Sequence, residues 1–157
     1  AKGLESALGA HSSTRKHHYM FFIRHRPKFL NFRPMKHDDL DWIPLTPELQ
    51  ADMAGQAAEG ALLAARQKKV GEIVLARYNG RWFAMRNRCP HQGYALAGGR
   101  VTAEGRVECP YHKFTFGLAD GREPSGTCSA VQTFPLRERD GQYEIGINRS
   151  IWSFLRF

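Results

Sequence analysis

Two short apolar runs, EIVLARY over residues 72–78 and RWFAMR over residues 81–86, are separated by the pair Asn79-Gly80. An Asn-Gly pair between two β-type runs is the strongest short-range signal of a hairpin. Three further turn segments follow the same pattern. Residues 103–105 separate the runs RVT and RVEC, residues 119–121 follow the run FTFGL, and residues 140–141 separate TFPLRER from QYEIGI. Short strands at this spacing predict an all-β fold, a small antiparallel sandwich or barrel.

The residues before and after these runs have a different pattern. Thr46 is a good helix N-cap, and Pro47 and Glu48 suit the first helical turn, so we expect a short helix near 47–58. Residues 1–41 show no clean period, and we expect an extended arm that lies along a partner or along its own domain. Residues 148–157 form an apolar, aromatic tail that must pack somewhere.

Charge is distributed unevenly along the 157 residues, whose formal net charge is +8. Residues 1–36 contain eight basic groups and one acidic group, whereas residues 37–157 contain fifteen basic and fourteen acidic groups. The chain is therefore a nearly neutral domain with a basic arm, which could bind nucleic acid, an anionic membrane face or an acidic protein surface or could simply be solvated. No apolar run is long enough to cross a bilayer.

Four residues that can bind metals lie in two loops that each follow an apolar run: Cys89 and His91 in RCPHQGYALAGG, and Cys109 and His112 in ECPYHKF. A proline after each cysteine stiffens its loop, and glycines in the first loop allow close backbone approach to an anionic sulfur group. A tetrahedral Cys2His2 zinc site would use the same ligand types, although the spacing differs from that of a zinc finger. Alternatively, the two loops could contain unrelated cysteines and histidines that form no shared site.

The segments CPHQGYAL and CPYHKFTF, with seventeen residues between His91 and Cys109, resemble the two cluster-binding motifs of the Rieske iron–sulfur family. The similarity extends over residues 60–147, and it implies a domain over 42–147 that binds a [2Fe–2S] cluster. It also implies that Cys89 and Cys109 bind an inner iron, while His91 and His112 bind an outer iron near the surface. The arm 1–41 and the tail 148–157 resemble no part of the family.

This chain departs from the high-potential members of the family. Those members carry two further cysteines that form a disulfide between the loops, where this chain has Tyr94 and Tyr111. They also carry hydroxyl groups near the cluster, where this chain has Lys113, Phe114 and Phe116, and Lys113 replaces a common glycine. Because hydroxyl donors to sulfur raise the reduction potential, we expect a potential near the low end of the Rieske range, about −150 mV.

Three functions fit these features. The first is one-electron transfer, by a carrier or by an electron-carrying accessory subunit of a larger assembly such as a respiratory one. The second is a small ferredoxin or reductase component of a Rieske oxygenase-type system. The third is a structural subunit whose loops are held together by metal. We expect no catalytic site of its own, because the chain has no room for the mononuclear iron domain of a complete oxygenase.

Partners and compartment follow from the same features. We expect redox partner proteins to approach the exposed edge formed by His91 and His112, and other subunits to contact the arm 1–41 and the tail 148–157. Nucleic acid is not expected as a partner, and contact with a membrane surface stays open. The Arg-rich, acid-poor arm favours the matrix side of the mitochondrion, with the bacterial cytoplasm as the alternative. Cys128 is expected to be a partly buried free thiol without a redox role.

Overall fold

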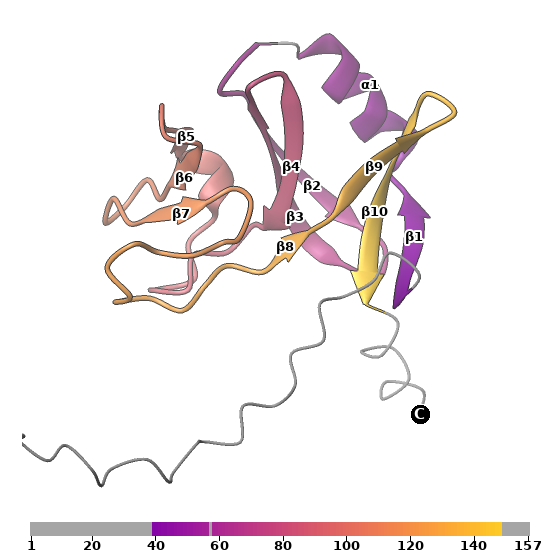
Figure 1. Cartoon of the computed structure of the whole chain (residues 1–157). Coiled ribbons are helices and arrows are strands. Elements are labelled where there is room, and N and C mark those ends of the chain that lie inside the picture. The colour runs from indigo at the N-terminus through magenta and orange to yellow at the C-terminus, as the bar shows by residue number, and fades with distance from the viewer. Residues whose placement is uncertain (1–38, 57, 149–157) are drawn as a thin grey trace, which may run out of the picture. The chain divides into compact units, whose positions relative to one another are not determined.

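The computed structural model describes residues 39–56 and 58–148 (Figure 1). Most of the predicted arm, residues 1–38, and the tail residues 149–157 lie outside the described residues. The described part contains ten strands in three antiparallel sheets and one α-helix, α1, so the predicted all-β fold with a short helix is confirmed. None of its helices is long and apolar enough to span a membrane.

The central sheet has the strand order β2-β3-β4-β8. It contains β2 Leu62–Gln67, β3 Gly71–Tyr78, β4 Arg81–Arg86 and β8 Thr133–Phe134. The β3–β4 hairpin turns at Asn79 and Gly80 as predicted, and both residues have positive φ, 49° and 70°. The sequence did not reveal β2, because LLAARQ consists of good helix formers and becomes a strand only by pairing with β3.

The second sheet has the order β1-β10-β9, and its edge strand β1 comes from the start of the described chain. Its members are β1 Leu40–Pro44, β9 Leu136–Arg139 and β10 Gln142–Asn148. The β9–β10 hairpin was predicted, but β1 was not, because its partner β10 lies at the other end of the described sequence. The last two residues of the predicted arm, 40 and 41, therefore belong to the sheet.

Pro135 separates β8 from β9, although the sequence suggested one continuous strand over TFPLRER. Proline has no amide hydrogen to donate to a sheet ladder, so the chain changes partner at this residue. β8 pairs with β4 in the central sheet, and β9 pairs with β10 in the second sheet. The carbonyl oxygen of Pro135 still accepts a hydrogen bond of 2.8 Å from Gly146 N.

A third, smaller sheet lies at one end of the central sheet (Figure 1). It consists of β5 Arg100–Val101, β6 Arg106–Glu108 and β7 Thr115–Gly117. A 3₁₀ helix, η2 Leu96–Gly98, leads into it. On the opposite side α1, Pro47–Gly55, begins at the predicted N-cap, where Thr46 Oγ1 accepts a hydrogen bond of 3.4 Å from Leu49 N. The helix ends three residues before the predicted 58.

Strand β3 is buried on both faces and separates two apolar cores. Ile73 and Leu75 face the first core, while Val74 and Ala76 face the second, and all four are fully buried. The alternation follows from the two-residue period of a strand. The first core joins α1 and the two larger sheets. The second core lies between the central and third sheets and contains Cys89, Leu96, Val107, Cys109, Phe116, Leu118 and Val131.

Candidate metal centre

The two loops that carry the predicted ligands are closed by equivalent backbone hydrogen bonds. Cys89 N donates to Tyr94 O at 2.7 Å, and Cys109 N donates to Phe114 O at 2.8 Å, so each cysteine amide bonds to the carbonyl five residues later. The first loop follows β4 and the second follows β6. Each cysteine is therefore held at the end of a strand, in a loop of the same size and closure.

The structure brings the four predicted residues together as a buried pair and an exposed pair. Cys89 is 2% exposed and Cys109 is 0% exposed, and both are free thiols in side-chain contact. His91 and His112 are exposed, with their Nδ1 atoms 3.1 Å apart and their rings at 84°. Phe114 packs against the His91 ring, with 4.8 Å between the ring centroids. Sulfur donors thus lie inside the protein and nitrogen donors lie at its surface.

The electrostatics of the buried pair favour a bound cation. Burial raises the pKa of the Cys89 thiol, and neighbouring Cys109 acts in the same direction. Backbone hydrogen bonds from His91 and Gln92 lower the same pKa but do not cancel the effect of burial. A thiolate at this position is therefore costly by itself, and a positive metal would stabilise it.

The four candidate ligands form two pairs. Among residues 39–56 and 58–148, no three or more Cys, His, Asp or Glu side chains surround a single point as a lone metal ion requires. The donors instead form a thiol pair and an imidazole pair. Two sulfur and two nitrogen donors in two pairs match the donor set of a Rieske [2Fe–2S] centre.

Charged side chains fix the third sheet beside the second loop. Arg100 binds Glu108 with two hydrogen bonds, Nε to Oε1 at 3.1 Å and Nη2 to Oε2 at 3.0 Å. Lys113 Nζ lies 3.6 Å from Glu108 Oε1. The hydrogen bonds from Arg100 hold the pKa of Glu108 below its usual range. This cluster connects β5, β6 and the second loop next to Cys109.

A family model of the Rieske [2Fe-2S] domain matches residues 42–135, which is more than half of the chain. The chain belongs to the Rieske family. The cofactor of this family is a [2Fe–2S] cluster, and the paired donors of the two loops fit it. The resemblance of the two loop motifs to this family is thereby confirmed.

Relatives of this Rieske protein include ferredoxin components of oxygenase systems. The ferredoxin component of the alkene monooxygenase system of Xanthobacter autotrophicus is 34% identical over 77 residues, 48% of this chain and 62% of that protein. The ferredoxin subunit of the 3-phenylpropionate/cinnamic acid dioxygenase of Photorhabdus laumondii is 30% identical over 78 residues, 49% of this chain and 74% of that protein. The chain therefore spans less than two thirds of the first relative.

Solved structures show the same Rieske fold. The Sphingomonas yanoikuyae B1 ferredoxin superposes on this chain with a TM-score of 0.52 and 25% identity, covering 60% of this chain and 91% of the ferredoxin. That coverage leaves much of this chain without a counterpart in the ferredoxin.

Tyr94 and Tyr111 connect the two loops of the Rieske domain without a covalent bond. Their rings are stacked, with centroids 3.6 Å apart and an interplanar angle of 16°. Tyr94 is 38% exposed and Tyr111 is 58% exposed. The sequence resemblance predicts that these two positions lie where high-potential members join the loops by a disulfide. In this structure an aromatic stack forms the contact between the two loops.

A double-mutant cycle on Tyr94→Ala and Tyr111→Ala is expected to give a coupling free energy of about 1 kcal/mol, because stacked aromatic pairs contribute this much beyond their area. Urea unfolding of the cluster-loaded protein measures the four free energies. The control combines Tyr94→Ala with Tyr143→Phe, which lies on β10 of the second sheet. The effects of these two changes on the free energy of unfolding should be additive. A coupling below about 0.3 kcal/mol for the stacked pair would contradict the proposed contact.

Lys113 adopts a left-handed backbone conformation, which residues with a Cβ rarely take. Its φ is 60°, and the equivalent residue of the first loop, Gly93, has φ 79°. Both residues come four positions after their cysteine, directly before the residue whose carbonyl oxygen accepts the hydrogen bond that closes the loop. The loop closure therefore requires positive φ at this position, and Lys113 accepts the strain.

Lys113→Gly is expected to stabilise the loaded protein by about 1 kcal/mol relative to Lys113→Ala, because a Cβ in the left-handed region costs about that much. Both variants lose the ion pair with Glu108, so the comparison isolates the backbone. Thermal unfolding should show a midpoint higher by about 4 °C for the glycine variant. Equal midpoints would show that the turn tolerates a Cβ without strain.

Cys128 lies partly buried against the second core and is a free thiol, as predicted. Burial raises the pKa of its thiol, and the charge of Glu123 acts in the same direction.

Two further residues near the first loop, Arg86 and Arg88, were not singled out from the sequence. Their signal was two arginines separated by one residue directly before the first candidate ligand.

Proposed function

We propose that this protein is a one-electron carrier of the Rieske type, a ferredoxin-like component that exchanges electrons with a partner enzyme. The observation that carries the proposal is the placement of a buried thiol pair next to an exposed imidazole pair in a Rieske domain. Buried sulfur donors can hold a redox group firmly. Exposed imidazoles give that group an edge at the protein surface.

In this proposal Cys89 and Cys109 bind the inner iron of the cluster, and His91 and His112 bind the outer iron. When bound, the cluster accepts and releases one electron. The cysteines lie in the second core, where Leu96 and other apolar side chains exclude water. The histidines lie at the surface and mark the edge at which a partner would exchange electrons.

The partner class is supported by the relatives. Two of them are named as ferredoxin components of a monooxygenase and a dioxygenase system. We infer that the partner of this chain is likewise a redox enzyme. That the arm 1–41 and the tail 148–157 contact a partner stays a prediction, as does an assembly of the respiratory type. The mitochondrial matrix and the bacterial cytoplasm both stay predictions, and free cysteines suit either reducing compartment.

Anaerobic purification, followed by iron, zinc and sulfide assays and EPR of the dithionite-reduced protein, tests the proposal. We expect about two irons and two sulfides per chain with a Rieske-type EPR signal. A redox titration should give a midpoint near −150 mV, the low end of the Rieske range, because Phe114 and Phe116 offer no hydroxyl to the sulfurs. An EPR-silent protein with one zinc and no sulfide would overturn electron transfer and leave a metal-stapled structural role.

A further inference from the structure

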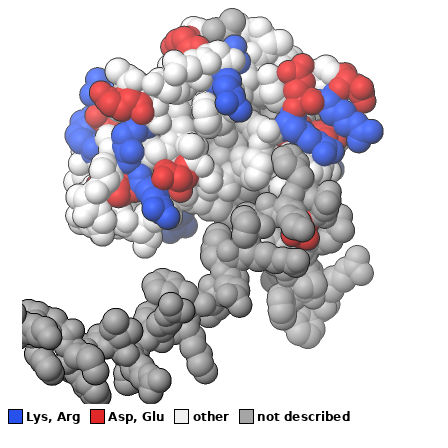
Figure 2. All heavy atoms as spheres, viewed as in Figure 1, with Lys and Arg blue, Asp and Glu red and all other residues white. Residues whose placement is uncertain are grey.

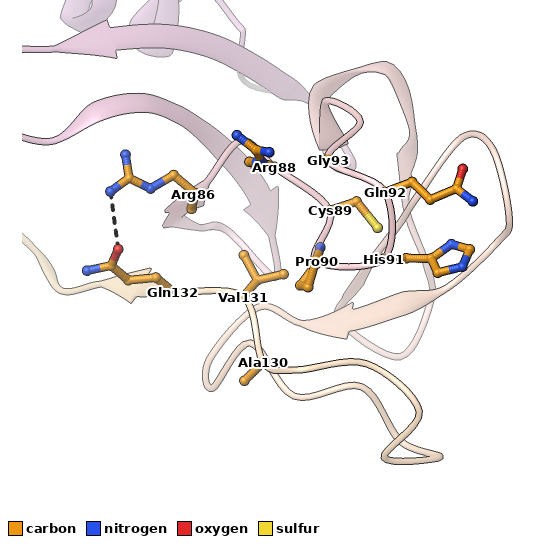
Figure 3. A pocket seen from close by; sticks show the side chains of 10 residues that line it. All are labelled: Arg86, Arg88, Cys89, Pro90, His91, Gln92, Gly93, Ala130, Val131 and Gln132. Atoms are coloured by element: carbon orange, nitrogen blue, oxygen red, sulfur yellow. Dashed lines mark hydrogen bonds between the residues drawn. The ribbon is translucent and has the colours of Figure 1, made fainter.

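A hollow of about 430 Å³ opens beside the first loop, between that loop and residues 130–132 (Figure 3). Its lining includes Arg86, Arg88, His91, Gln92 and Gln132, and no acidic residue contributes to it. Figure 3 shows both arginines and Gln132 on one side of Cys89, and His91 on the other side. The hollow thus lies directly next to an exposed candidate ligand of the cluster.

Arg86 is positioned by neutral groups rather than by an anion. Its guanidinium donates hydrogen bonds to the carbonyl oxygen of Val70 and to Gln132 Oε1, the latter at 3.3 Å. It also lies over the Phe134 ring, 5.7 Å from the centroid. These contacts hold the side chain in one place, and no acidic side chain of residues 39–56 or 58–148 forms an ion pair with it.

Arg88 lies against the backbone of Gly93 in the same loop. A Cβ on Gly93 would come within 3.1 Å of Arg88 Nη2, so the glycine makes room for the guanidinium. The side chain is exposed, and across the described ranges 39–56 and 58–148 neither arginine forms an ion pair. The two residues therefore provide two positive charges at the hollow that the described protein does not neutralise.

Arginines elsewhere on the domain are often paired. Arg100 and Lys113 contact Glu108, and Arg137 contacts Glu144. On the face shown in Figure 2, basic side chains over β5–β7 and over the β9–β10 hairpin lie next to acidic ones. Arg77, Arg81, Arg106 and Arg122 also form no ion pair within residues 39–56 and 58–148, so the hollow is distinguished by its position beside His91 and not by unpaired charge alone.

We propose that this hollow receives an aspartate or glutamate side chain of an acidic redox partner. The inference rests on the proposed electron-transfer function and names the chemistry of its partner. A guanidinium presents a planar set of donors that matches a carboxylate, and Gln92 and Gln132 can add neutral hydrogen bonds. The charge attracts an acidic surface, and the contact holds that surface against His91.

The local charge can be measured with two small oxidants of opposite charge, ferricyanide and hexaammineruthenium(III). Stopped-flow oxidation of the reduced protein of 157 residues gives one rate constant for each oxidant. We expect Arg88→Glu to slow the ferricyanide reaction about tenfold at low ionic strength and to speed the ruthenium reaction. Both differences should decline as salt is added, because ions screen exposed charges.

Arg81→Glu is the matched control. Arg81 is exposed, lies on the same strand β4 as Arg86 but at its other end, and gives the same change in net charge. The basic residues of 1–36 are present in all the proteins and contribute equally. Equal rate changes in Arg81→Glu and Arg88→Glu would show an effect of net charge alone and would overturn the proposal. If Arg88→Glu does not load iron, Arg88→Gln replaces it, with a smaller effect expected on the same rates.

Carboxylate binding itself is tested with a pentaglutamate peptide, using pentaglutamine as the neutral control. Calorimetric titration of the loaded protein should show pentaglutamate binding that weakens about tenfold in Arg88→Glu but not in Arg81→Glu. Unchanged affinity in Arg88→Glu would place the peptide elsewhere, for example on the basic arm, and would overturn the docking site while leaving electron transfer intact. A protein without the Rieske EPR signal would instead overturn the proposed function, and the docking proposal with it.

Discussion

Cys109→Ser is expected to reduce the iron content from about two atoms per chain to nearly none and to abolish the visible absorption of the cluster. Cys109 is completely buried at the end of β6, and its amide closes the second loop. A serine hydroxyl is a far poorer iron ligand than a thiolate, and in this apolar core it would also lack a hydrogen-bond partner. Iron and sulfide assays on the anaerobically purified variant measure the loss.

The third cysteine supplies a matched control for this variant. Cys128→Ser makes the same chemical change at a thiol that lies outside both loops. It should retain the iron, the sulfide and the EPR signal of the unmodified protein. Full iron content in Cys109→Ser, or equal losses in the two variants, would show that Cys109 is not a ligand.

Gly99→Ala is expected to destabilise the domain by about 3–5 kcal/mol, because a methyl group cannot be placed at this position. An added Cβ would lie 1.8 Å from the backbone oxygen of Glu108, far inside van der Waals contact. That oxygen belongs to β6, directly before Cys109, so the chain would have to move at the second loop. We therefore expect loss of the cluster together with loss of stability, measured by iron content and by urea unfolding.

Gly98→Ala distinguishes this clash from a general preference for glycine. At Gly98 an added Cβ would meet only Pro110 Cγ at 3.6 Å, an ordinary contact. The Gly98 variant should keep its iron and lose less than about 1 kcal/mol of unfolding free energy. Similar losses in both variants would contradict the close approach between Gly99 and Glu108.

The candidate ligands could be found from the sequence because their chemistry is concentrated in two short segments. Cysteine, proline and histidine within four residues restrict the loop backbone, and each segment follows a strand that ends at the same side of the domain. Arg86 and Arg88 can also be read directly from the sequence. The sequence does not show that they form no ion pair with the described residues, because ion pairs such as Arg100–Glu108 join different strands.

The strands that were missed show where local signals end. Hairpins with Asn79-Gly80 and Asp140-Gly141 were predicted because both strands and the turn are contiguous in sequence. β1 has no nearby partner, and only its pairing with β10 makes it a strand. β2 has the composition of a helix, and its pairing with β3 overrides that preference.

By itself, the sequence determined the hairpins, the short helix, the family and the two loops that carry the candidate ligands, because each depends on residues within a few positions of one another. The tertiary structure decided which groups are buried and which are paired. It placed the thiols inside and the imidazoles outside, stacked Tyr94 on Tyr111, and left two arginines beside His91 without an ion pair to any described residue. Burial and electrostatic pairing depend on contacts between distant segments, so only the folded chain fixes them.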